Sequence, residues 1–183
     1  MRFIMTSENA GWAEGMEWTM RYLNKHGLKK GSSFEVRVKY ADDVEFKGKV
    51  GNKIERHADL QVCPNGPVVG GCTYFEFKSV KELPPPPFNE QFVKDLLNGD
   101  VKDLSQIKWI FDGEKILDGK KIPAGSDFKK EMTNAIKAVF KNSDNEDALK
   151  KAAKKILKNT KATKESLENA IIANFDEIFK LEY

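Results

Sequence analysis

Two short stretches of the chain hold residues whose types and spacing could perform hydrolytic chemistry. The segment 74–79 reads Tyr-Phe-Glu-Phe-Lys-Ser. Successive side chains of a strand point to opposite faces, so Glu76 and Lys78 share one face and the two phenylalanines share the other. In the preceding predicted strand Leu60 points to the core, which turns Asp59 the other way. The pattern predicts two carboxylates and one ammonium group together on adjacent strands.

Such a group of side chains suits the hydrolysis of a phosphodiester. Asp59 and Glu76 offer the oxygen ligands that Mg²⁺ or Mn²⁺ prefers, and such ions bind one or two carboxylates together with water and phosphate oxygens. A bound ion lowers the pKa of its water and neutralises charge that builds up on the phosphate. Lys78 beside that water can orient or deprotonate it. The alternative is a solvated strand edge with cross-strand charge pairing.

The elements that must position these residues follow from hydrophobic periodicity and from breaking residues. A first helix over 7–26 is capped by Ser7 and stopped by Gly27. A run of four prolines over 84–87 separates the strands from the next helix. The predicted strands are 33–40, 58–63, 72–80 and 106–112, and the later predicted helices are 88–98, 128–140, 148–157 and 167–179.

The arrangement Asp59 … Glu76-Phe-Lys78, in this order of elements, resembles the PD-(D/E)xK nuclease superfamily, although Ala58 stands where the motif has proline. The resemblance implies an α/β, restriction-endonuclease-like core of helix, three strands, helix and strand. That core would occupy residues 1–118. Residues 119–183 would form a Lys-rich helical extension packed on or beside it.

The resemblance also implies further site residues. An acid of the first helix often joins the metal site in this superfamily, and Glu17 is the better match, with Glu14 behind it. A glutamine in the helix after the lysine strand is also common, and Gln91 occupies that place. The implied catalytic set is therefore Asp59, Glu76, Lys78, Glu17 and Gln91, with the metal on the three acids.

The strand around 107–111 resembles the last core strand of toxin members of the superfamily. This implies an antibacterial effector domain that is delivered into a target-cell cytoplasm and neutralised by a cognate immunity protein. DNA is the expected substrate, and the alternative is RNA, transfer RNA in particular, cut by the same kind of site.

Composition sets the broad class of the protein. Hydrophobic residues make up 40% and charged residues 32% of the 183 residues, which is typical of a globular chain and excludes a disordered one. No apolar run approaches the roughly 20 residues that a membrane helix needs. The first five residues are too few for the apolar core of a signal peptide.

Charge is uneven along the chain, whose net charge is only +3. The segment 150–164 contains seven lysines and no acid. It is either the solvated face of a helix or a surface that meets phosphates. In the second case a rival function follows, a non-catalytic nucleic-acid- or protein-binding module that needs no divalent ion.

The two cysteines, Cys63 and Cys72, flank a Gly- and Pro-rich loop. With only two histidines in the chain they do not form a four-ligand zinc site of the usual kind. If the loop closes a hairpin, the two sulfurs could face each other and form a disulfide. Buried free thiols are the expectation for such a pair.

Overall fold

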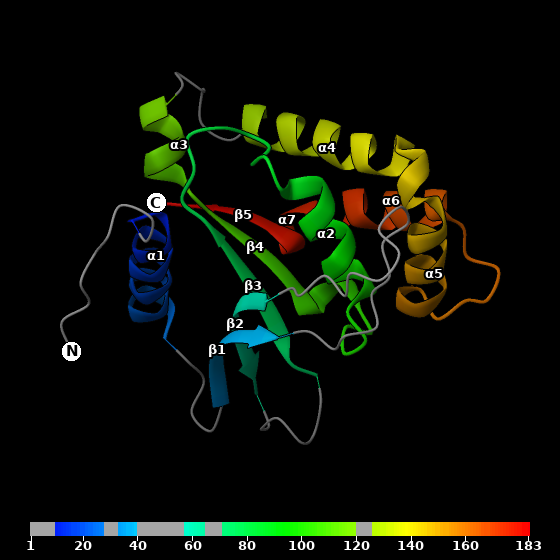
Figure 1. Cartoon of the computed structure of the whole chain (residues 1–183), viewed down its shortest axis with the longest axis horizontal. Helices are drawn as coiled ribbons and strands as arrows, with labels where there is room; N and C mark the ends of the chain where they lie inside the picture. The colour runs from blue at the N-terminus through cyan, green and yellow to red at the C-terminus, as the bar shows by residue number, and fades with distance from the viewer. Residues whose placement is uncertain (1–9, 28–32, 40–56, 65–70, 120–125) are drawn as a thin grey trace.

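A mixed α/β fold is built around one sheet, with helices on both faces (Figure 1). The computed structural model describes residues 10–27, 33–39, 57–64, 71–119 and 126–183. Within these ranges five strands form the sheet in the order β1-β2-β3-β4-β5. The strands are β1 (Ser33–Lys39), β2 (His57–Cys63), β3 (Thr73–Lys78), β4 (Ile107–Asp112) and β5 (Phe179–Glu182).

Strand direction changes in the middle of the sheet. β1, β2 and β3 pair antiparallel, whereas β3, β4 and β5 pair parallel. Helix α2 (Phe88–Leu97) lies in the crossover between β3 and β4, as parallel neighbours require. The predicted order of helix, three strands, helix and strand is confirmed. The loop predicted over 42–52 falls outside the described residues.

Helix α1 (Ala10–His26) covers one face of the sheet. Its Trp18 is buried in a cluster with Leu60, Phe77 and Ile110, and Tyr22 packs against the same cluster. Gly27 ends the helix with φ of 68°, a conformation that glycine adopts without steric cost. The predicted strand alternation is therefore confirmed for the apolar side of β2 and β3.

The main core lies on the opposite face, beneath α2 and the helices that follow. Trp109 of β4 is fully buried, and the rings of Phe88 and Phe92 from α2 lie 5.1 and 6.1 Å from it, both edge-on. Behind α2 lie α4 (Ser126–Lys141), α5 (Glu146–Ile156) and α6 (Lys164–Ala173), each with an apolar side in this core. In the part of the chain that the structure describes, no helix has the length and apolar character needed to cross a membrane.

The end of the chain differs from its prediction as a third helix over 167–179. The structure has α6, the short α7 (Phe175–Ile178) and then strand β5, which runs parallel to β4. Phe179 pairs with Trp109 and its ring is 2% exposed, so burial beside the sheet outweighs the local helical pattern. The C-terminal segment thus returns to the sheet of the core. A short helix, α3 (Gly113–Gly119), was not predicted either.

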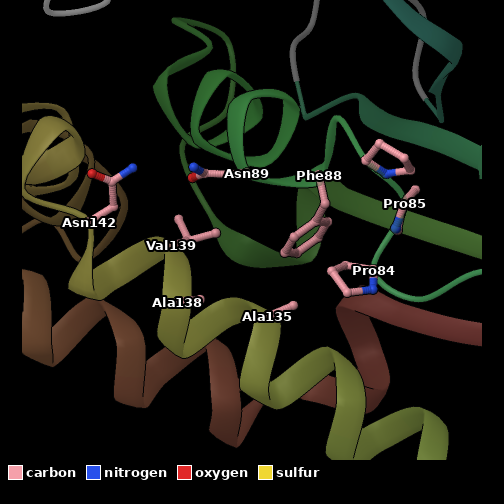
Figure 2. A pocket seen from close by; sticks show the side chains of 9 residues that line it. Pro84, Pro85, Phe88, Asn89, Ala135, Ala138, Val139 and Asn142 are labelled. Atoms are coloured by element: carbon pink, nitrogen blue, oxygen red, sulfur yellow. The ribbon is translucent and has the colours of Figure 1, made fainter.

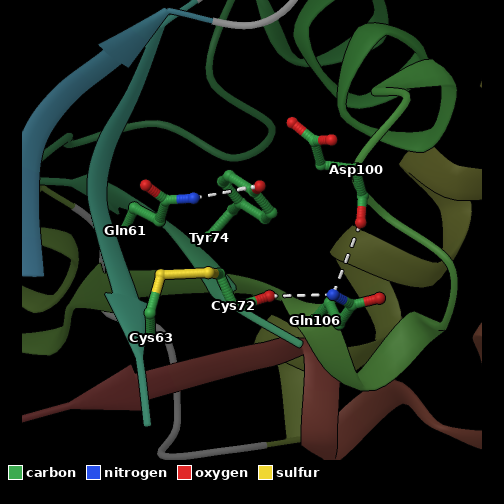
Figure 3. The surroundings of a disulfide bond; sticks show 6 residues. All are labelled: Gln61, Cys63, Cys72, Tyr74, Asp100 and Gln106. Atoms are coloured by element: carbon green, nitrogen blue, oxygen red, sulfur yellow. Dashed lines mark hydrogen bonds between the residues drawn. A yellow bond between two sulfur atoms is a disulfide. The ribbon is translucent and has the colours of Figure 1, made fainter. Parts of the chain in front are cut away.

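A disulfide joins Cys63 to Cys72 at the end of the β2–β3 hairpin (Figure 3). The expectation of free thiols is therefore wrong. The hairpin register pairs Val62 with Thr73, so the two cysteines stand at the next facing position. Their Cα atoms are 4.2 Å apart. Sequence spacing alone could not supply this register.

Polar side chains tie this end of the hairpin to the turn after α2 (Figure 3). Gln106 donates from Nε2 to the carbonyl oxygen of Cys72 at 2.9 Å and to that of Asp100 at 3.5 Å. Gln61 donates to the Tyr74 hydroxyl at 3.1 Å. Burial, and after it the charge of Asp100, raise the pKa of the Tyr74 phenol, while the bond from Gln61 lowers it.

Removing the disulfide should destabilise the fold without changing its topology. We expect Cys63→Ser with Cys72→Ser to lower the free energy of unfolding by about 2.7 kcal/mol, the chain-entropy value for a closed loop of about ten residues. Urea denaturation measures this change. Reduced wild-type protein should match the double variant, and an unchanged midpoint would contradict the expectation.

Lys155 of α5 caps the C-terminal end of α2. Its Nζ donates to the carbonyl oxygens of Leu96 at 2.8 Å and Asn98 at 2.6 Å, which lack helical partners at a helix end. Burial, followed by the charges of Lys102 and Lys151, lowers the pKa of Lys155 to about 8. A neutral amine still has two N–H groups, so the cap survives deprotonation.

This cap predicts a pH-dependent stability. Because the pKa of Lys155 is lower in the folded than in the unfolded chain, the unfolded chain binds more protons between about pH 8 and 10.5. Stability rises with pH where the unfolded state binds more protons. The free energy of unfolding of wild type relative to Lys155→Met should therefore increase from pH 7.5 to pH 10 in urea titrations. A constant difference would show that Lys155 does not titrate in this range.

Candidate active site

The ammonium group of Lys78 is the centre of the candidate site. Its Nζ contacts Glu76 Oε1 on the same strand and donates to Gln91 Oε1 of α2 at 2.8 Å. The side chains of Lys78 and Glu76 are only 12% and 6% exposed. Strand alternation places both residues on one face of the sheet, as predicted. Helix α2 covers this face and brings Gln91 to them.

The indole ring of Trp109 lies against this ammonium group. Lys78 Nζ lies 5.1 Å from the centre of the indole ring, a distance at which a cation is attracted to the ring face. The parallel register pairs Trp109 with Glu76, which sets the indole beside both charged residues. Trp109 Nε1 donates to the buried Asp95 Oδ2 at 3.0 Å, so the ring is fixed in turn.

The role of Trp109 beside the site could not be read from the sequence. Alternation in 107–111 identifies a core residue, and the indole is indeed fully buried. Its second role depends on which β3 residue it faces, and that depends on the register between β3 and β4. A one-residue slip would have moved it to the α1 face.

Asp59 stands where β2 and β3 stop pairing. The register ends at Leu60 facing Phe75, and one further step would set Asp59 opposite Glu76. At this point the Phe77 N–H donates to Asp59 Oδ2, at 2.8 Å, instead of to a backbone carbonyl group of β2. The carboxylate is thereby held against β3, next to the residue that follows Glu76.

The carboxylates of Asp59 and Glu76 supply some of the oxygen ligands that a hard divalent cation needs. Asp59 and Glu76 are carboxylates on neighbouring strands, and a carboxylate has lone pairs for a metal besides one hydrogen bond. Within the described ranges, no group of three or more His, Cys, Asp or Glu side chains could together hold a metal ion. Asp59 and Glu76 would therefore hold the ion with water and substrate oxygens completing its shell.

The predicted third acid, Glu17, is not brought to Asp59 and Glu76. Its side chain is exposed on α1, and that helix packs through Trp18 on the opposite face of the sheet. Neighbouring residues of a helix point about 100° apart, so the packing of Trp18 against the sheet turns Glu17 away from it. The side chain of the second choice, Glu14, lies outside the described residues.

Another buried acid, Asp112, ends β4 on the α1 side. Its Oδ2 accepts from the Ser79 hydroxyl at 3.1 Å and from Arg21 of α1 at 3.3 Å. Its Oδ1 accepts the N–H of Lys115 at 3.3 Å and so caps α3. These bonds tie α1 and α3 to the strand ends that carry the candidate site, and they give Asp112 a structural role.

A hollow lies away from the candidate site (Figure 2). An apolar pocket of about 200 Å³ lies between the proline segment, the start of α2 and α4, and Pro84, Pro85, Phe88, Ala135 and Val139 are among its lining residues. None of the predicted catalytic residues lines it. The candidate site is a polar arrangement on the sheet and α2, separate from this pocket.

Comparisons with known proteins yield no assignment. No family model matches the chain, and neither a curated protein nor a solved structure matches it.

Asp59 should contribute to stability as well as to the site. We expect Asp59→Ala to lower the free energy of unfolding by about 2 kcal/mol, because it removes a charged acceptor from the Phe77 N–H. Asp59→Asn keeps an acceptor oxygen and should lose less than half of that amount. Urea denaturation of both variants separates the two cases. Equal stability of Asp59→Ala and wild type would contradict the structural role.

Proposed function

We propose that this protein is a metal-dependent nuclease of the PD-(D/E)xK type, with a restriction-endonuclease-like core. The observation that carries the proposal is the position of the Lys78 ammonium group between Glu76 and Gln91, with Asp59 on the adjacent strand. A lysine beside a buried carboxylate, with a second carboxylate on the neighbouring strand, supplies the ammonium group and the oxygen ligands that metal-dependent phosphodiester hydrolysis uses.

Each residue has a distinct role in the proposal. Asp59 and Glu76 would hold Mg²⁺ or Mn²⁺, which when bound supplies an acidified water and neutralises phosphate charge. Lys78 orients the attacking water or stabilises the charge that develops on the phosphate. Gln91 holds the Lys78 ammonium through Oε1, and the indole face of Trp109 supports it from below.

DNA is the substrate that we propose, with RNA as the alternative for the same residues. The proposed biological role, a toxin domain delivered into competing bacteria and countered by an immunity protein, rests on the resemblance of the sequence to toxin members of the superfamily.

The test is cleavage of plasmid DNA and of total RNA with Mg²⁺ or with a chelator. Wild type should cut only with the metal. Glu76→Gln and Lys78→Met should each lower the rate at least about 100-fold, the range for losing a group that acts on the reacting atoms. Glu82→Gln and Lys137→Met, which change exposed residues of the same types, should cut like wild type.

Two outcomes would overturn the proposal. Cutting that persists in Glu76→Gln and Lys78→Met, prepared in the same way as wild type, would mean that a different group or a contaminant hydrolyses the substrate. Nucleic-acid binding without any cleavage, insensitive to divalent ions and to Asp59→Asn, would instead support the rival function of a binding module.

A further inference from the structure

The exposed side of α5 and the turn after it carry lysines that form no ion pair with the acids of the described residues. At the two ends of the segment, Lys150 pairs with Glu146 at 2.6 Å and Lys164 approaches the same carboxylate at 3.9 Å. Between them lie four exposed lysines, Lys151, Lys154, Lys158 and Lys161, here called the α5 lysine face. Across the described parts of the chain, no acid forms an ion pair with any of these four.

The underlying helix holds this face in place. Leu149, Ala152, Ala153 and Ile156 of α5 are buried against the core, so Lys151 and Lys154 of the same helix point outward. Lys158 and Lys161, after the end of the helix, are exposed as well. From residue 151 to the end of α5 at residue 156 the helix advances by roughly 7.5 Å, and the turn that carries Lys158 follows directly. Duplex DNA presents one phosphate charge for about every 1.7 Å of its axis, so a row of this length meets several charges.

The repulsion between these lysines has an energetic cost that nearby described residues offset only in part. Lys151 and Lys155 are four positions apart within α5, and like charges at this spacing destabilise a helix by about 0.2–0.5 kcal/mol per pair. Lys102, from the turn after α2, adds to the crowding around Lys155. Asp100 and Asp103 lie close enough to offset part of this charge, and they leave a cationic excess.

The face adjoins the helix that carries part of the candidate site. Lys155, between the exposed lysines, caps the C-terminal end of α2, and Gln91 lies earlier in that same helix. Residues 91–97 span roughly 9 Å of helix. One nucleic-acid molecule that follows α2 can therefore contact both the lysine face and the site.

We propose that the α5 lysine face binds the phosphate backbone of nucleic acid, without regard to base sequence, and so holds the substrate of the candidate site. Only the second half of this proposal rests on the proposed nuclease function. Backbone binding is a property of the surface and can be measured where no cleavage occurs.

The test measures anisotropy of a fluorescent DNA duplex at several salt concentrations, with chelator present and in the Glu76→Gln background. In that background, the triple change Lys151→Gln, Lys154→Gln and Lys158→Gln should weaken binding about tenfold or more near 0.1 M salt. The slope of log K against log salt should fall by up to about 2.7, because each phosphate contact contributes about 0.9.

The matched control changes Lys130, Lys137 and Lys141 to Gln. These lysines form an exposed stripe on α4, and no ion pair joins them to other described residues. This triple removes the same net charge and should change the affinity less than twofold. If both triple variants lost the same affinity for DNA, net charge alone would explain the loss, and the proposal would be overturned.

Two further outcomes would also overturn it. Unchanged binding in the α5 triple would mean that the face does not contact DNA. Competition by polyglutamate as strong as that by unlabelled duplex would instead indicate a surface for an acidic protein. A failure of the nuclease proposal appears in cleavage assays of Glu76→Gln and leaves this binding result unaffected.

Discussion

The burial of Trp109 is the constraint on which most of the described structure depends. Its ring is packed by Phe88 and Phe92 from α2, and its strand position faces Phe179 of β5 on one side and Glu76 of β3 on the other. Since the indole N–H is bonded to Asp95, the ring can lie in few orientations. The helix layer, the parallel half of the sheet and the ammonium group of Lys78 are thus all arranged around one side chain.

Charged groups near this core are retained by specific partners. An isolated ammonium or carboxylate in a buried place costs several kcal/mol, which is offset only by good hydrogen bonds or an opposite charge. Lys78 has Glu76, Gln91 and the Trp109 face, whereas Lys155 has two helix-end carbonyl groups and no ion pair with an acid of the described residues. The first arrangement concentrates charge where hydrolysis could use it, and the second closes a helix end.

Asp59 shows how local and tertiary roles meet in one residue. Its carboxylate occupies the point where β2 and β3 cease to pair, and it replaces a backbone acceptor for the Phe77 N–H. The same bond holds the carboxylate close to the strand of Glu76. At the other end of the same hairpin the disulfide between Cys63 and Cys72 fixes the register. The hairpin is therefore held at both ends by side chains.

The sequence by itself determined the first four strands, the order of elements up to β4, and the common face of Glu76 and Lys78. These follow from local alternation and from breaking residues, which act over a few positions. Tertiary structure decided what depends on distant segments: the pairing of Phe179 with Trp109, the disulfide, and the exclusion of Glu17 by the packing of α1. A sequence pattern shows which face a side chain takes on its own element, whereas the register and docking of elements settle which other residues it meets.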